Sequence, residues 1–205
     1  MTKVVKFPIP TPEKFGPLRA RKKKDTNLEK HGQLNLFTGG KVIKLNKLST
    51  LEEALLIDDQ GDKQEARKLY LRAIEGGDSQ ADAYCNLGII EWEEGNQTRT
   101  IDYFTLALSH DPRHYEAHYN LANLYGEIGD FRLAKAHYNI SIEIEPSFPN
   151  NYFNLGLTLA MNKEFAEAIQ VLNKYRQLTS SDEQKEADNL IEKLTGALWE
   201  VGLSG

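Results

Sequence analysis

Apolar residues recur every three or four positions along most of this chain, from about residue 47 to residue 201. That spacing gathers them on one face of an α-helix. Gly95, Pro112, Gly129 and Pro146 interrupt the pattern; glycine readily takes the left-handed conformation that ends a helix, and proline cannot continue one. The expected fold is therefore all-α. The predicted helices span 80–94, 97–110, 114–128, 131–144, 148–161 and 164–177.

The helical pattern repeats itself at a fixed interval. An Asn-Leu pair at residues 86–87 returns at 120–121 and at 154–155, each 34 residues after the last. Small residues let two helices approach closely, so each unit is predicted to be a pair of antiparallel helices. A small residue follows each leucine: Gly88, Ala122 and Gly156. The next helix has a small or short polar residue at Thr100, Ala134 and Ala168. Four positions later it has a large apolar residue at Phe104, Tyr138 and Leu172.

A fainter copy of the unit precedes these three, over residues 47–80. It has Glu53 where the other units have leucine. Ser49 and Glu52 are predicted to start its first helix as a capping box, in which each side chain accepts a hydrogen bond from the other residue's main-chain N–H. Terminal repeats are often atypical because one face meets solvent rather than a neighbour.

The apolar spacing also continues beyond the last unit. It predicts a helix over 182–200, started by a second capping box of Ser181 and Gln184. We expect this helix to cover the otherwise exposed end of the stack, since repeat arrays need capping elements. The predicted body is four helix pairs and a capping helix.

The recurring positions resemble those of the tetratricopeptide repeat, a 34-residue helix–turn–helix unit. The best-matching stretches are "AYCNLGIIEWEEGNQTRTIDYFTLALSHDP" and "AHYNLANLYGEIGDFRLAKAHYNISIEIEP". The resemblance implies a tetratricopeptide-type α-solenoid, which the capping helix follows and an extended basic N-terminal arm precedes. The expected parts are an arm over 1–46, repeats over 47–80, 81–114, 115–148 and 149–182, and a capping helix and tail over 183–205.

One position departs from the family pattern. Glu91 stands where a tyrosine or similar core residue is usual, and Tyr125 fills that place in the next unit. We expect Glu91 to be partly exposed or paired with a base. The carboxylates of "EWEEGN" and "LIDDQGD" stand at the ends of predicted helices and are expected to be solvated.

The recurring asparagines are the main candidates for a binding site. In the family, their position points into a concave groove lined by the first helix of each unit. An amide both donates and accepts, so a row formed by Asn86, Asn120 and Asn154 can hold the main chain of an extended peptide whatever its sequence. The resemblance implies such a ladder, as in the repeat domains of protein O-glycosyltransferases. The alternative is that these asparagines only bond a neighbouring helix.

Other residues are expected to share that groove and give it an apolar, aromatic character suited to anchoring a partner. It lacks the paired bases with which chaperone-binding members grip a terminal carboxylate, because Cys85, Ile89 and Asn150 stand in their places. The remaining groove candidates are Trp92, Tyr119, Asn123, Phe153 and Leu157.

Charge is divided unevenly along the chain, whose net charge is −5. Residues 1–46 carry eleven Lys/Arg and three Asp/Glu, whereas residues 47–205 carry fourteen and twenty-seven. The basic arm is expected to be a solvated tail, to meet phosphate on a nucleic acid, or to fold back on the acidic repeats of its own chain or of a second copy. Its basic block comprises Arg19, Arg21, Lys22, Lys23 and Lys24.

A second motif of the arm is "QLNLF". It resembles the pentapeptide with which bacterial polymerases and repair proteins dock on the sliding clamp, through Gln33, Leu34, Leu36 and Phe37. The other interpretations are a small hairpin over 33–45 packed on the first repeat, or a plug formed by the same residues in the groove.

The sequence gives no support to an enzyme, and we expect no catalytic residue, cofactor or metal. His114 and His118 have helical spacing that can hold zinc, but they lack the H-E-x-x-H order and an obvious third ligand. The single cysteine and the lack of a long apolar run favour a cytoplasmic protein that does not cross a membrane. The expected function is protein binding in the groove, and the alternative is a nucleic-acid-associated factor that acts through the arm.

Overall fold

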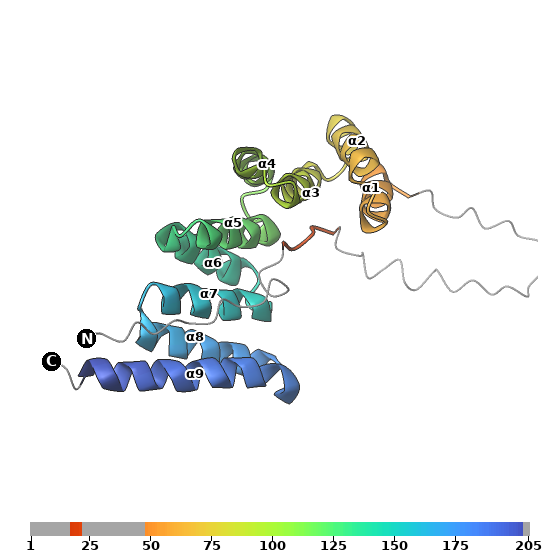
Figure 1. The fold of residues 1–205 in the computed structure, drawn as a ribbon. Helices are drawn as coiled ribbons and strands as arrows, with labels where there is room; N and C mark the ends of the chain where they lie inside the picture. The colour runs from red at the N-terminus through yellow and green to blue at the C-terminus, as the bar shows by residue number, and fades with distance from the viewer. Residues whose placement is uncertain (1–16, 22–47, 203–205) are drawn as a thin grey trace, which may run out of the picture. The chain divides into compact units, whose positions relative to one another are not determined.

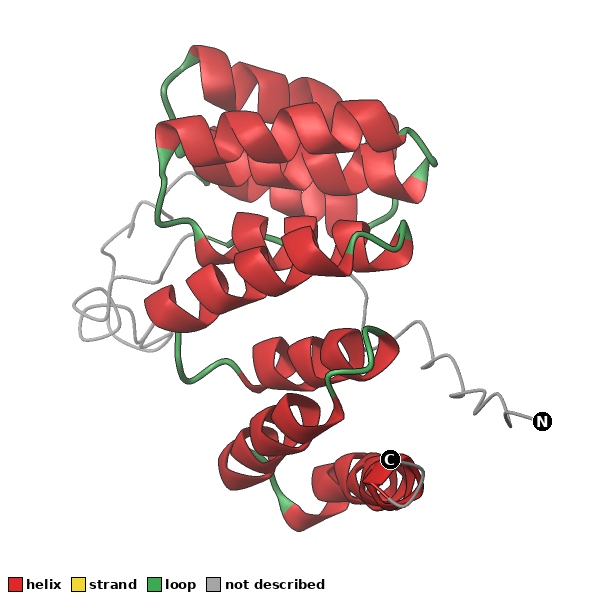
Figure 2. Cartoon of the chain, turned by 90° about the vertical axis from the view of Figure 1, so that its left-hand side faces the viewer, coloured by secondary structure: helices red, strands yellow, loops and turns green. Residues whose placement is uncertain are grey.

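The computed structural model describes residues 17–21 and 48–202. All the regular secondary structure of these residues is helical, which confirms the predicted fold class (Figure 2). Every helix predicted between residues 80 and 178 is present, with ends within one residue of the prediction. The helices are α1 (Thr50–Asp59), α2 (Lys63–Glu75), α3 (Gln80–Glu93), α4 (Gln97–His110), α5 (Tyr115–Glu127), α6 (Phe131–Ile144), α7 (Pro149–Met161), α8 (Phe165–Leu178) and α9 (Ser181–Gly202).

The chain divides into two compact units. Of the described residues, the amino-terminal unit contains 19–21 and 48–110, with helices α1 to α4. The carboxyl-terminal unit contains 17–18 and 111–202, with helices α5 to α9. Within each unit, consecutive helices pack against one another in chain order (Figure 1).

The ends of several helices follow the sequence signals. Ser49 and Glu52 form the predicted capping box at the start of α1. Gly95 and Gly129 have φ angles of 81° and 83°, as required where the first helix of a unit turns into the second. Lys163 takes the same place in the last unit and has the same left-handed conformation, with φ of 66°.

The predicted second capping box is wrong by one residue. Helix α9 begins at Ser181, and its cap is Ser180, whose main-chain N–H and hydroxyl donate to Oε2 of Glu183 at 3.1 and 2.8 Å. Gln184 instead donates to the carbonyls of Arg176 and Thr179, at 2.7 and 2.9 Å. Two adjacent serines offer two possible registers of the same motif, and the sequence alone does not separate them.

The small residues after the leucines let the two helices of a pair meet at short range. A Cβ atom on Gly88 would lie 2.6 Å from a ring carbon of Phe104, and one on Gly156 would lie 2.7 Å from Leu172. Contacts that close are not found between real side chains, so glycine is required at both positions. The prediction of close helix approach is confirmed.

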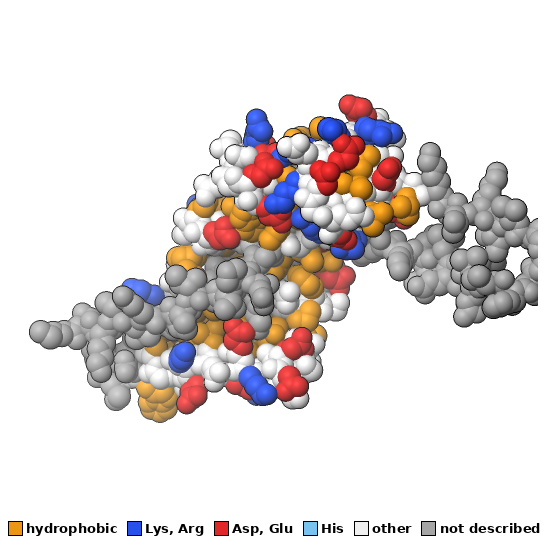
Figure 3. All heavy atoms as spheres, turned by 45° about the vertical axis from the view of Figure 1, so that its right-hand side comes forward, with side chains coloured by type: hydrophobic (Ala, Val, Ile, Leu, Met, Phe, Trp, Pro, Cys, Tyr) orange, Lys and Arg blue, Asp and Glu red, His pale blue; other side chains and the backbone are white. Residues whose placement is uncertain are grey.

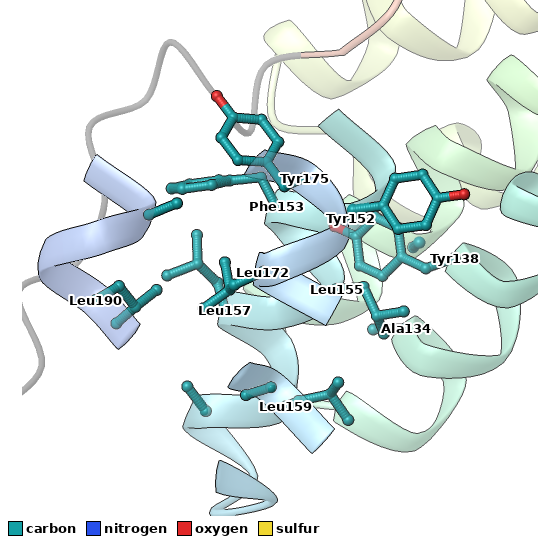
Figure 4. Close-up of a cluster of buried hydrophobic side chains, with 14 of the residues drawn as sticks. Ala134, Tyr138, Tyr152, Phe153, Leu155, Leu157, Leu159, Leu172, Tyr175 and Leu190 are labelled. Carbon is teal, nitrogen blue, oxygen red and sulfur yellow. The ribbon is translucent and has the colours of Figure 1, made fainter. Parts of the chain in front are cut away.

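Each unit has its own hydrophobic core. In the carboxyl-terminal unit, side chains of α5 to α9 interdigitate, and the rings of Phe153 and Tyr175 pack with their centroids 5.1 Å apart (Figure 4). In the amino-terminal unit, the core is built by α1, α2 and α3, with Tyr70 completely buried. The recurring alanine and large apolar positions, including Ala134, Tyr138 and Leu172, have no exposed surface.

Glu91 is paired with a base, one of the two expected arrangements, and it is almost completely buried. Arg67 of α2 donates to its Oε1 at 3.1 Å, and Asn96 donates to its Oε2 at 2.9 Å. The expectation that all carboxylates of "EWEEGN" and "LIDDQGD" are solvated is therefore wrong, because Glu91 and Asp58 are both buried with partners.

Candidate functional site

Asn86 of α3 holds the main chain of a residue far upstream. Its side-chain Oδ1 accepts from the N–H of Ala20 at 2.9 Å, and its Nδ2 donates to the carbonyl of the same residue, also at 2.9 Å. Both Asn86 and Ala20 are completely buried. We call this pair of hydrogen bonds a bidentate amide contact.

The equivalent asparagine of the carboxyl-terminal unit makes the same contact. Asn120 of α5 accepts from the N–H of Leu18 at 2.7 Å and donates to its carbonyl at 2.9 Å. The side chain of Leu18 packs against the core of this unit. The same side-chain chemistry is therefore repeated at two of the recurring positions, once in each unit.

The geometry of this contact explains why asparagine suits it. In an extended chain, the N–H and C=O of one residue point to the same side, and a neighbouring antiparallel strand bonds both groups at once. The carboxamide of Asn86 or Asn120 takes the place of that strand, with one donor and one acceptor at the right separation. Such a contact recognises only main-chain groups of the bound segment. Any residue that can adopt an extended conformation can therefore make it, provided that its side chain fits.

Asn154 differs from the other two recurring asparagines. Its Nδ2 donates to the hydroxyl of Tyr119 at 3.0 Å and to Oδ1 of Asn123 at 2.9 Å. Both hydrogens of its amide nitrogen are thus used within the carboxyl-terminal unit. Among the described residues, the amide nitrogen of Asn154 thus bonds side chains, whereas those of Asn86 and Asn120 bond main-chain carbonyls.

Arg19 lies against a cluster of polar side chains of the amino-terminal unit that the sequence analysis did not single out. Its guanidinium contacts Oδ2 of Asp58 on α1, and its second terminal nitrogen lies 3.2 Å from Oε1 of Glu93 on α3. The hydroxyl of Tyr70 on α2 donates to Oδ2 of Asp58 at 2.9 Å. We call Asp58, Tyr70 and Glu93 the arginine subsite.

Burial governs the electrostatics of this subsite. Asp58 is 5% exposed, and desolvation raises the pKa of its carboxyl above the ordinary value, while the charge of Arg19 and the hydrogen bond from Tyr70 act in the opposite direction. Burial and the neighbouring Asp58 carboxylate also raise the pKa of the Tyr70 hydroxyl. A guanidinium at this position stabilises the charged form of Asp58.

A signal for Asp58 is present in the sequence. The buried residues of α1 are Leu51, Ala54, Leu55 and Asp58, which is the i, i+3, i+4, i+7 stripe of an amphipathic helix with a carboxylate in its last position. An acidic residue inside an apolar stripe must be paired when it is buried. The basic arm is the available source of a partner, and folding back on the acidic repeats is one of the arrangements expected for it.

The outer part of the basic segment makes weaker contacts. Arg21 lies 3.1 Å from Asp59, and both side chains are largely exposed. Glu93 is shared between Arg19 and Lys63 of α2, at 3.2 and 2.8 Å. Acidic and basic side chains are interspersed on the face of this unit that Figure 3 shows.

Most of the other predicted groove residues are buried. Cys85, Ile89, Tyr119, Asn123, Phe153 and Leu157 are all buried in the full chain. Trp92 is half-buried, with its ring edge-on to Phe104 at a centroid distance of 6.3 Å. Their contact with a partner stays a prediction. Lys22, Lys23, Lys24, Gln33, Leu34, Leu36 and Phe37 lie outside the described residues.

The two histidines considered as zinc ligands have structural contacts. His114 caps α5, with its Nδ1 accepting from the N–H of Ala117 at 3.2 Å. His118 pairs with His137 of α6, their Nδ1 atoms 3.0 Å apart. Burial, and secondarily His118, lower the pKa of His137 to about 4. Residues 17–21 and 48–202 contain no group of three or more side chains placed to hold a metal ion.

The fold and the recurring amide positions define a helical-repeat protein. Residues 51–114 and 119–183, more than half of the chain, match the family model described as tetratricopeptide repeat. The chain belongs to the tetratricopeptide repeat family, and its fold is the all-α solenoid class predicted from the recurring positions. None of the described helices combines the length and apolarity needed to cross a bilayer.

Two curated relatives show how far the sequence similarity extends. The chain is 35% identical over 108 residues to human protein O-mannosyl-transferase TMTC3, a match that covers 50% of this chain and 12% of that protein. It is 27% identical over 106 residues to human tetratricopeptide repeat protein 8, covering 52% and 19%. The matches thus span only a small part of each relative.

Solved structures share the fold at lower identity. The PilF structure of Pseudomonas aeruginosa is 20% identical, with a TM-score of 0.64 over 74% of this chain and 68% of that one. The first tetratricopeptide domain of Spaghetti (RPAP3), bound to the HSP90 peptide SRMEEVD, is 22% identical, with a TM-score of 0.53 over 58% and 94%. Tetratricopeptide repeat domains are protein-interaction scaffolds.

Proposed function

We propose that this chain is a non-catalytic, cytoplasmic scaffold that binds extended segments of a partner protein, through Asn86 in the amino-terminal unit and through Asn120 in the carboxyl-terminal unit. Each asparagine would hold the main chain of the partner by a bidentate amide contact. In the carboxyl-terminal unit, apolar residues such as Tyr119 and Phe153 would pack against the partner's side chains.

The observation that supports the proposal most is the contact between Asn86 and Ala20. A buried asparagine normally satisfies its amide within the fold, whereas Asn86 directs both ends of its amide at a segment with no regular secondary structure. Asn120 does the same with Leu18 in the other unit. These contacts with the chain's own segment support an extended main chain as the ligand of the two amides.

The alternative of nucleic-acid binding through the arm has less support. Two members of the basic block, Arg19 and Arg21, contact the carboxylates of Asp58 and Asp59 and are engaged there rather than facing a phosphate. Docking on a sliding clamp would use residues 33–37, which lie outside the described residues. Neither possibility is part of the proposal.

The test is peptide binding by an N86A/N120A double variant of the full chain. An array of unrelated peptides, probed with fluorescently labelled protein, measures capture independently of any known partner. The double variant is expected to lose most of the signal across the whole array, because main-chain recognition does not depend on peptide sequence. Each lost hydrogen bond between uncharged groups should reduce the binding free energy by about 0.5–1.5 kcal/mol.

The matched control is Asn139→Ala, which removes an exposed asparagine on α6, a second helix of its unit. This variant should capture peptides like the wild-type chain. Circular dichroism should show that the double variant keeps its helical content. Unchanged capture by a folded double variant would remove the two asparagines from the proposed binding site.

A further inference from the structure

The arginine subsite is unusual because it is built into the apolar stripe of α1. Asp58 follows Leu51, Ala54 and Leu55 on the buried face, where an apolar residue would complete the core at no electrostatic cost. Tyr70 is also completely buried, and its hydroxyl donates a hydrogen bond to the same carboxylate. A buried carboxylate with a dedicated hydrogen-bond donor is a feature of recognition sites as well as of structural ion pairs.

The subsite discriminates between cations by its shape. Its two carboxylates come from different helices, Asp58 from α1 and Glu93 from α3, and the two terminal nitrogens of Arg19 reach one each. A guanidinium spans two acceptors with a fixed planar fork of donors, whereas an ammonium has no such fork and would have to meet both carboxylates from a single nitrogen. The arrangement therefore selects arginine over lysine.

The next position along the segment is restricted by size. Ala20 has no exposed surface, and Asn86 holds both of its main-chain polar groups. A larger side chain has no room there without displacement of the segment. At the position after it, Arg21 faces the exposed Asp59, which favours a basic residue only weakly.

The resident arginine does not use all the bonding capacity of the subsite. Oδ1 of Asp58 is buried and has no hydrogen-bond partner among the residues that the structure describes, while Oδ2 receives both Arg19 and Tyr70. An arginine that engaged both oxygens in the bidentate mode would bind more strongly than Arg19 does. A competing segment with such an arginine would therefore gain a hydrogen bond that the resident segment lacks.

From these contacts we infer that Asp58, Tyr70, Glu93 and Asn86 form a recognition site for extended protein segments with the pattern arginine, small residue, basic residue, and that Arg19–Ala20–Arg21 occupies it as an internal competitor. The inference rests on the proposed function, because it uses the Asn86 contact. It adds the chemical class of the partner and a mechanism that limits its access. When a site is mostly filled, the apparent affinity for a ligand is the intrinsic affinity multiplied by the small fraction of molecules in which the site is free.

The inference is tested with full-length protein and a fluorescent peptide of residues 14–24, KFGPLRARKKK. Two peptides of equal charge serve as matched controls. In one, the residues at positions 19 and 20 are exchanged (KFGPLARRKKK); in the other, lysine replaces the arginine at position 19 (KFGPLKARKKK). Fluorescence anisotropy gives the affinity of each peptide for the wild-type chain and for an R19E/A20L variant, whose own segment no longer fits the site.

The R19E/A20L variant should bind the first peptide at least about tenfold more tightly than the wild-type chain does, because the internal competitor is gone. Both control peptides should bind it at least about tenfold more weakly, since a hydrogen bond to a charged group is worth about 1.5–3 kcal/mol. Adding Asp58→Asn to this variant should remove the preference for arginine over lysine.

Several results would overturn the inference. Equal binding of the three peptides would exclude an arginine subsite, and equal binding by wild-type and variant chains would exclude internal competition. If the three peptides bind equally but N86A abolishes their binding, the proposed function stands without this inference. If N86A leaves all binding unchanged, the proposed function fails as well.

A measurement on the unaltered segment covers the case in which R19E/A20L does not fold. By hydrogen exchange, the amide of Ala20 should be protected in the wild-type chain and should exchange at least about tenfold faster when the first peptide is added in excess, because a freed amide loses its hydrogen-bonded protection. No change on addition of saturating peptide would contradict the proposed competition.

Discussion

Gly88 lies so close to Phe104 that a Cβ atom added to the glycine would be 2.6 Å from Cε1 of the ring. The Gly88→Ala variant should therefore lose stability, since overpacking a buried contact costs about 1–3 kcal/mol. Chemical denaturation of the two proteins measures the difference. In contrast, Gly196 of α9 is exposed with no atom within 4 Å of its Cβ direction, and Gly196→Ala should gain up to about 1 kcal/mol from helix propensity. A neutral or stabilising Gly88→Ala would show that the helices can separate at this point.

Lys163 occupies the turn position that glycine fills in the preceding units, with φ of 66°. A side chain in the left-handed region costs about 1–2 kcal/mol, so Lys163→Gly should raise the free energy of unfolding by about 1 kcal/mol. The matched control is Lys185→Gly in the first part of α9. Glycine there should lower the free energy of unfolding by a similar amount, because glycine weakens a regular helix. Thermal melting of both variants checks the opposite signs, and a loss of stability in Lys163→Gly would refute the strain argument.

Asn154 is predicted to matter for stability rather than for holding a peptide's main chain. Its replacement by alanine leaves Tyr119 and Asn123 without the hydrogen bonds they receive from Nδ2. Each of these hydrogen bonds is worth about 0.5–1.5 kcal/mol, so Asn154→Ala should lower the melting temperature clearly. Calorimetry measures the melting temperature, and the peptide array measures binding by the same variant. If the Asn154→Ala chain were stable but no longer captured peptides, Asn154 would have the role proposed for Asn86.

The pair of His118 and His137 should make stability depend on pH. Burial lowers the pKa of both side chains, that of His137 to about 4. The unfolded chain takes up protons near pH 6.5, so the contribution of the neutral pair is complete above that pH and is lost as the pH falls toward about 4. Denaturant midpoints between pH 7 and 5 should fall for the wild-type chain.

The H118Q/H137Q double variant is the corresponding control for this pH dependence. Glutamine does not titrate, so its denaturant midpoint should change less over the same interval. Lys135 lowers the pKa of carboxylates such as Glu164. The stability that such a carboxylate contributes is lost only at lower pH, so it does not affect the comparison between pH 7 and 5. An identical slope in both proteins would show that folding does not lower the pKa of these two imidazoles.

The repeat architecture could be predicted from the sequence because its signals are redundant. The period of 34 residues fixes Gly88, Ala122 and Gly156 at equivalent contacts, and the turn residues fix helix ends to within one residue. Redundancy fails where a motif has two possible registers, as at Ser180 and Ser181. One register differs from the other by a single hydrogen-bond pattern, which local sequence does not determine.

The site was only partly predictable for a different reason. Asn86 and Asn120 recur with the repeat, so their common role could be inferred from their spacing. The partners of Arg19 do not recur, because Asp58 belongs to the atypical first unit and lies 39 residues away along the chain. A long-range ion pair leaves no periodic trace in one sequence, and the charge difference between arm and body indicated only that some such contact could form.

The order of residues along the chain gives the Asp58 contact a consequence for biosynthesis. A carboxylate enclosed by apolar residues is unfavourable until a cation reaches it. Arg19 leaves the ribosome before α1 does, so the counter-ion is already present when Asp58 emerges. The first two helices can then close around a charge without waiting for the later repeats or for another protein.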